Sequence, residues 1–144
     1  MHNDLNNDFF NPTIQTRFDK DGNCLSACIA TLFNVSIDKV PWFEDENTDW
    51  IYELSEWMIK KFNKYVCPVK FDYDSQIDLL GNSLIITSIN SPNPNVKRHA
   101  VITQNYKVIF DPMFGECNYP IVHKDNATFL LIGDVRLKTI KGEN

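Results

Sequence analysis

The stretch CLSACIATLF places its apolar residues at the i, i+3, i+4 and i+7 spacing of one helix face: Leu25, Cys28, Ile29 and Leu32. Two alanines in the same stretch add helix propensity. We expect a buried helix that begins at Asn23 or Cys24, and Asn34 is a residue type that can end it. A short turn that Ser36 caps and Pro41 stops should follow this helix.

A second helix is predicted from about Thr48 to Phe62. Large apolar residues form one stripe along it, and charged residues lie off that stripe. The stripe consists of Trp50, Leu54, Trp57, Met58 and Lys61 or Phe62. The charged positions are Asp49, Glu53, Glu56 and Lys60. Aromatic residues at helical spacing are usually core residues, so we interpret the stripe as the face that packs against the core.

After residue 65 the pattern changes to short runs rich in β-branched residues, bounded by Pro, Gly, Asn and Asp. We predict a strand in each of these runs: 66–73, 83–90, 99–105, 106–110 and 127–133. Helices that come first and strands that come later are typical of an α+β protein. The predicted fold is therefore α+β, with the early buried helix packed on a mainly antiparallel sheet.

Composition and charge narrow the class of protein. The chain has 144 residues, of which 43% are hydrophobic, and this size suits one globular domain over 1–144. A formal net charge of −5 gives no basic surface for nucleic acid. No run of residues has the apolar length of a signal peptide or a membrane helix. We expect a cytoplasmic protein without nucleic-acid or membrane partners, and a loose N-terminal arm over 1–13.

The four cysteines are Cys24, Cys28, Cys67 and Cys117. In a cytoplasmic chain they are expected to be free thiols, metal ligands or a nucleophile rather than disulfides. Cys24 stands out because it follows a Gly-Asn turn at the start of the predicted helix. The positive end of a helix favours a thiolate, so this position suits a nucleophile. Cys28 lies one turn further along and is expected to be a core residue.

The stretch HAVITQNYKVIFDP predicts a hairpin that turns near Asn105 and Tyr106. A tight hairpin with that turn would place His99 opposite Asp111, as cross-strand neighbours. A carboxylate that holds an imidazole is the base and orienting group of a nucleophilic triad. Cys24 would then be the thiol from which the imidazole takes a proton.

Two kinds of metal site are alternatives to this triad. Zinc would need several of six residues, which show no short paired-ligand spacing: Cys24, Cys28, His99, Cys67, Cys117 and His123. A calcium loop beginning at Asp19 fails, because its required Gly falls on Cys24 and its bidentate Glu on Ala30. We expect no metal and no cofactor, with His123 at the surface and His2 in the tail.

The order of Cys, His and Asp along the chain resembles that of the papain-like cysteine peptidases. The similarity is to small bacteriocin-leader-processing peptidases and to uncharacterised bacterial and phage relatives, over residues 13–114. The matching segments are IQTRF, GNCLSACIATLF, VSIDKVPWF, RHAVI and VIFDP. The resemblance implies that Cys24 is the nucleophile, His99 the general base and Asp111 its orienting partner. It also implies that Gln15 donates to the oxyanion.

Two functions follow from these observations. The first is a cysteine-dependent hydrolase or acyltransferase that acts on an amide or related acyl bond of a peptide, a protein or a small molecule. The second is a catalytically silent module of the same fold that sequesters or inhibits a partner, as a phage accessory protein would. The sequence specifies neither the substrate nor the oligomeric state.

Overall fold

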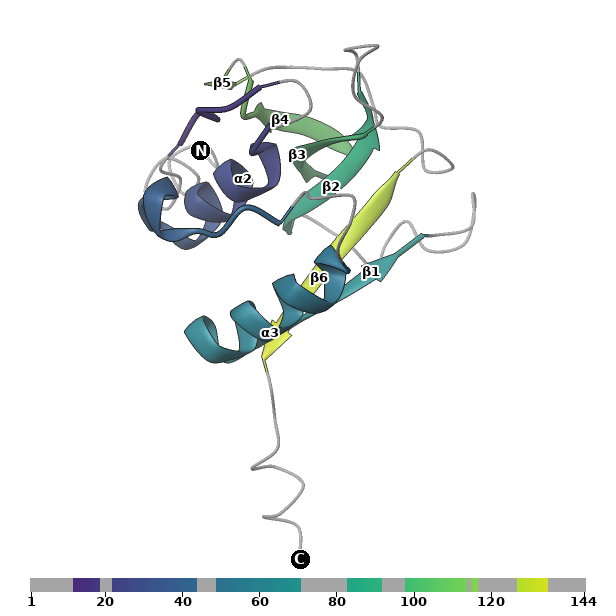
Figure 1. The fold of residues 1–144 in the computed structure, drawn as a ribbon. Helices are drawn as coiled ribbons and strands as arrows, with labels where there is room; N and C mark the ends of the chain where they lie inside the picture. Colours follow the sequence, from purple (N-terminus) through teal and green to yellow (C-terminus); the bar gives the residue numbers. More distant parts are fainter. Residues whose placement is uncertain are drawn as a thin grey trace, which may run out of the picture.

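The computed structural model describes residues 12–18, 22–43, 49–70, 83–91, 98–113, 115–116 and 127–134. These residues form an α+β fold of helices packed on an antiparallel sheet (Figure 1). The helical elements are α2 (Cys24–Phe33), the 3-10 helix η2 (Ile37–Lys39) and α3 (Trp50–Phe62). The strands are β1 (Lys64–Val69), β2 (Leu84–Asn90), β3 (Arg98–Gln104), β4 (Lys107–Asp111), β5 (Gly115–Glu116) and β6 (Thr128–Asp134).

The helix ends follow the polar residues that flank them. Asn34 and Asn63 end α2 and α3 in the left-handed conformation, with φ of 56° and 57°. Asp49 caps α3 by accepting a hydrogen bond from the backbone of Tyr52, and Ser36 caps η2 in the same manner. The predicted first helix and the turn after it are confirmed. The predicted start of the second helix, at residue 48, lies outside the described residues.

In the part of the chain that the structure describes, the sheet has six strands in the order β1-β6-β2-β3-β4-β5, and every neighbouring pair is antiparallel. The predicted strand runs are confirmed, although β1 begins at Lys64 and the predicted residues 71–73 lie outside the described residues. The short strand β5 was not predicted. Two residues are too few to leave a pattern in the sequence.

The helices cover one face of the sheet, and the main core lies beneath them (Figure 1). α2 packs against β2 and β3, and α3 packs against β1. The buried residues of this core include Leu25, Cys28, Ile29, Leu54, Met58, Ile86, Ile102, Phe110 and Leu130. The predicted core role of Cys28 and of the α3 stripe is therefore confirmed. A second buried cluster, which includes Val101, Val108 and Phe129, lies on the other face.

Neither described α-helix has the length and apolarity of a membrane-crossing segment.

At the N-terminal side, residues 1–11 of the predicted loose arm lie outside the described residues. Thr13 is held in place, because its backbone N–H donates to Thr31 Oγ1 at 2.9 Å.

The hairpin of β3 and β4 turns at Asn105 and Tyr106, as predicted, with φ of 54° and 66°. Its register contains a bulge, which shows in the pairs Gln104 with Lys107, Thr103 with Val108 and Ile102 with Phe110. Ile109 is the extra residue, and it packs toward the same cluster as Phe110. Asp111 is therefore diagonal to His99 rather than directly opposite it, so that part of the prediction is wrong.

The bulge determines which face Asp111 occupies. Side chains alternate between the two faces of a strand, so a hairpin without the extra residue would put Asp111 on the face away from His99. The bulge restores the shared face, and a diagonal neighbour remains within reach of a long side chain. The two side chains therefore meet despite the shifted register.

Candidate active site

The thiol of Cys24 lies at the junction between α2 and β3. Cys24 is the first residue of α2, and its sulfur accepts a hydrogen bond from the Ala100 backbone N–H at 3.3 Å. The Cys24 side chain is half-buried. The Ala100 nitrogen is bonded to the carbonyl carbon of His99, so the sulfur lies no more than about 6 Å from His99 Cα. The structure thus brings Cys24 beside His99.

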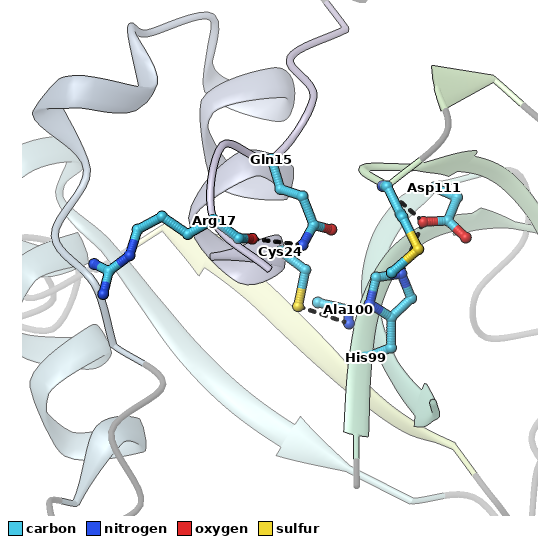
Figure 2. A network of polar contacts seen from close by, with 7 residues as sticks. Gln15, Arg17, Cys24, His99, Ala100 and Asp111 are labelled. Carbon is cyan, nitrogen blue, oxygen red and sulfur yellow. Dashed lines mark hydrogen bonds and ion pairs between the residues drawn. The ribbon is translucent and has the colours of Figure 1, made fainter. Parts of the chain in front are cut away.

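His99 and Asp111 form a buried pair at the end of the sheet. His99 Nε2 lies 2.7 Å from Asp111 Oδ1, and the two side chains are 4% and 0% exposed. The Met113 backbone N–H donates to the same carboxylate oxygen at 2.9 Å. Because Nε2 is held by the carboxylate, Nδ1 is the ring nitrogen available for proton transfer. Figure 2 shows the imidazole between the Asp111 carboxylate and the Cys24 side chain.

The Cys24 sulfur lies at the level of the β3 backbone, where the Ala100 N–H donates to it. Ala100 packs in the core under the helices, so His99 leaves β3 on the opposite face, as does its cross-strand partner Ile89. The backbone N–H groups of a strand lie close to the plane of the sheet. Because the Cys24 sulfur accepts a hydrogen bond from the Ala100 N–H, it lies beside β3 rather than above it. An imidazole from either face can approach a sulfur in that position.

Gln15 lies against the same end of the sheet, although it precedes α2 in the chain. Its backbone N–H donates to the Pro112 carbonyl at 2.8 Å, directly after Asp111. Its side-chain Nε2 donates to the Arg17 carbonyl at 2.8 Å. The side chain is 5% exposed, and Oε1 has no hydrogen-bond partner. The four residues proposed from the sequence thus gather in one region (Figure 2).

Sequence reasoning missed two contributors to this region. One is the Ala100 backbone N–H, which no side-chain pattern can reveal. The other is Asn23, whose side chain makes no capping hydrogen bond to α2 and binds residues 16 and 17 instead. An asparagine just before a helix indicates a hydrogen bond between its side chain and the nearby backbone, but not which residues supply the backbone groups.

Cationic side chains flank the site without entering it. The Arg17 guanidinium lies over the Trp42 ring, 4.7 Å from its centroid, and points away from Cys24 (Figure 2). Arg98, next to His99, donates to the Ser88 carbonyl and to Asn90 Oδ1 across the β2–β3 pair. Desolvation by burial lowers the pKa of the Arg98 guanidinium. Arg98 therefore fixes the beginning of β3, from which His99 projects.

Within the described ranges, no three His, Cys, Asp or Glu residues gather as a metal site would require. Cys117, His123 and His2 lie outside those ranges. A cavity of about 350 Å³ lies at the far end of α2, near Leu32 and Phe33, and Cys24 does not line it.

Comparison with known proteins found no match to the chain among family models, curated proteins or solved structures.

Proposed function

We propose that this protein is a cysteine-dependent hydrolase or acyltransferase with a papain-like arrangement of its site. Cys24 is the nucleophile, His99 the general base and Asp111 the group that orients His99. The observation that carries the proposal is the convergence of two contacts. The Cys24 sulfur is bound at the Ala100 N–H, and the neighbouring His99 is held through Nε2 by a buried carboxylate.

The proposed reaction begins with proton transfer from the Cys24 thiol to His99 Nδ1. The sulfur attacks the carbonyl carbon of an amide or related acyl bond, and the carbonyl oxygen becomes an oxyanion. When this intermediate collapses, the bond to the leaving group breaks and His99 returns the proton to that group. The acyl group remains on Cys24 as a thioester. Water or an amine then displaces it, with His99 again acting as the base.

Two features support stabilisation of charge in these steps. The N-terminus of α2 and the Ala100 N–H both favour a negative sulfur. The Gln15 Nε2 carries two hydrogens, one of which goes to the Arg17 carbonyl. The second is the proposed donor to the oxyanion. Loss of a single oxyanion donor costs an enzyme about 2.7–4 kcal/mol of transition-state stabilisation.

The test is acylation by p-nitrophenyl acetate, a general acyl donor. We expect a rapid release of nitrophenolate by the native protein, with an acetyl group found on Cys24 by peptide mapping. Cys24→Ala should lose this phase and keep its fold. Cys28→Ala should keep the phase and lose about 1 kcal/mol of stability, because its buried side chain packs in the core.

The contrary result is a native protein that forms no acetyl-Cys24, or a Cys24→Ala variant with an unchanged fast phase. Either result would favour the silent binding module, which needs no reactive thiol. Cys67 is exposed and lies on β1, so its acetylation serves as the internal reference for an ordinary thiol.

A further inference from the structure

We propose that Asn23 is a positioning residue: it holds the loop before α2 so that the Gln15 amide is fixed beside Cys24. This inference rests on the proposed function, because it assigns Asn23 to the oxyanion side of that site. Asn23 is 7% exposed and directly precedes Cys24. It occupies the N-cap position of α2, yet its side chain makes no hydrogen bond to the helix.

The side chain of Asn23 instead binds the loop through both of its polar atoms. Oδ1 accepts from the backbone N–H of Thr16 at 3.0 Å and from that of Arg17 at 2.9 Å. Nδ2 donates to Thr16 Oγ1 at 2.9 Å. The backbone N–H of Asn23 donates to the Arg17 carbonyl at 3.3 Å. Thr16 and Arg17 are therefore bound to the residue that begins the helix.

The Arg17 carbonyl links this arrangement to Gln15. The same oxygen that accepts from the Asn23 N–H also accepts from Gln15 Nε2 at 2.8 Å. If the Gln15 amide turned over, its oxygen would face the Arg17 carbonyl, and two acceptors would oppose each other. The amide nitrogen is thus directed by a carbonyl that Asn23 fixes.

A neutral amide suits this position better than a carboxylate. An aspartate could accept the same two backbone N–H groups, and Thr16 could rotate its hydroxyl to donate to the second oxygen. The added negative charge would then lie on the residue before Cys24, at the helix end that favours a thiolate. Asn23 makes the same contacts without placing a second negative charge near the thiolate.

The test compares two reactions of Cys24 in the whole protein. Acylation by p-nitrophenyl acetate passes through an oxyanion, whereas alkylation by iodoacetamide displaces iodide at a saturated carbon and forms none. Each rate is taken for Cys24 alone by subtracting the Cys24→Ala background. The ratio of acylation to alkylation therefore reports oxyanion stabilisation, and a change in the thiol alone affects both rates.

We expect Asn23→Ala to lower this ratio about tenfold. Gln15→Ala should lower the ratio at least as much, and adding Asn23→Ala to it should change the ratio by less than about twofold. Asn23→Asp should restore the ratio to near the native value while lowering both rates. If Asn23→Ala does not fold, Thr16→Val removes only the contact to Nδ2, and it should lower the ratio about threefold.

The two proposals fail in different ways. A native protein without acetyl-Cys24 would overturn the proposed function and this inference with it. A native protein that is acylated, with a ratio that neither Asn23→Ala nor Thr16→Val lowers, would overturn this inference alone. This inference alone would also be overturned if Asn23→Ala lowered the ratio by the same factor in the native protein and in the Gln15→Ala variant.

Discussion

At the scale of single residues, the Asp111 carboxylate is fully buried. It accepts hydrogen bonds from His99 Nε2 and from the Met113 backbone N–H. A carboxylate bound to one ring nitrogen fixes the orientation of the imidazole and leaves the other nitrogen free of that contact. Asp111 thus holds the His99 ring in place.

We predict that Asp111→Asn lowers the rate of Cys24 acylation by at least about a hundredfold, because the amide keeps the shape but removes the charge. Asp111→Ala should also lower the free energy of unfolding by about 1–3 kcal/mol, since it removes the acceptor of the buried His99 ring nitrogen and of the half-buried Met113 N–H. Stopped-flow release of nitrophenolate and urea denaturation measure the two effects. An Asp111→Asn protein with native acylation would exclude Asp111 from the catalytic site.

Only some residues of the candidate site could be predicted from the sequence. Cys24, His99 and Asp111 could be proposed from the sequence because a thiol, an imidazole and a carboxylate are distinctive side chains, and here they lie at the ends of predicted elements. The link from Asn23 to Gln15 was not found, because it consists of backbone groups of Thr16 and Arg17. Every residue carries such groups, so no sequence pattern distinguishes them.

At the scale of elements, the β3–β4 hairpin sets the geometry of the His99–Asp111 pair. Asn105 and Tyr106 both have positive φ, as the two central residues of a type I′ hairpin turn require. Asparagine tolerates this conformation, and a bulky residue such as tyrosine rarely adopts it. Tyr106 is 4% exposed and packs edge-on against Phe129, and this contact compensates for the backbone cost.

We predict that Asn105→Ala lowers the free energy of unfolding by about 1 kcal/mol, because alanine is strained in the left-handed region. Asn105→Gly should leave stability within about 0.5 kcal/mol of the native protein, since glycine adopts this conformation freely. Asn105 is exposed, so neither change removes packing. Equal stabilities of the alanine and glycine variants in urea would argue against this turn conformation.

Helices, caps and strand runs were predictable because each leaves a local periodicity or a flanking polar residue. The bulge was not, because Ile109 and its neighbours are apolar and fit either face of a strand. An extra residue in such a run shifts the register without changing the pattern. The predicted contact between His99 and Asp111 is confirmed, although the register from which it was predicted is wrong.

At the scale of the whole molecule, the candidate site lies at one end of the main core, against which Cys24 packs. The helices and the sheet enclose the core, and the site lies where α2 begins, β3 begins and β4 ends (Figures 1 and 2). α3 packs against β1, at the opposite edge of the sheet from β4. Stability and reactivity should therefore respond to different substitutions.

We predict that Met58→Ala in α3 lowers the free energy of unfolding by about 2–5 kcal/mol, because Met58 is fully buried. The rate of Cys24 acylation, corrected for the folded fraction, should change by less than about twofold. Urea denaturation and the nitrophenolate assay give the two values. A large loss of acylation by the folded variant would show that α3 supports the site directly.

A reactive pair of Cys24 and His99 is tested most directly by the pH dependence of thiol alkylation by iodoacetamide, followed separately for Cys24 and Cys67 by peptide mapping. We predict that Cys24 reacts at least about tenfold faster than Cys67 at pH 5.5, and that His99→Ala removes most of this advantage and leaves only the part due to the helix N-terminus and the Ala100 N–H. Both proteins carry the exposed Cys67 as an internal reference. Equal, slow alkylation of both cysteines at pH 5.5, or an advantage of Cys24 that is undiminished without His99, would show that the two residues do not form a reactive pair.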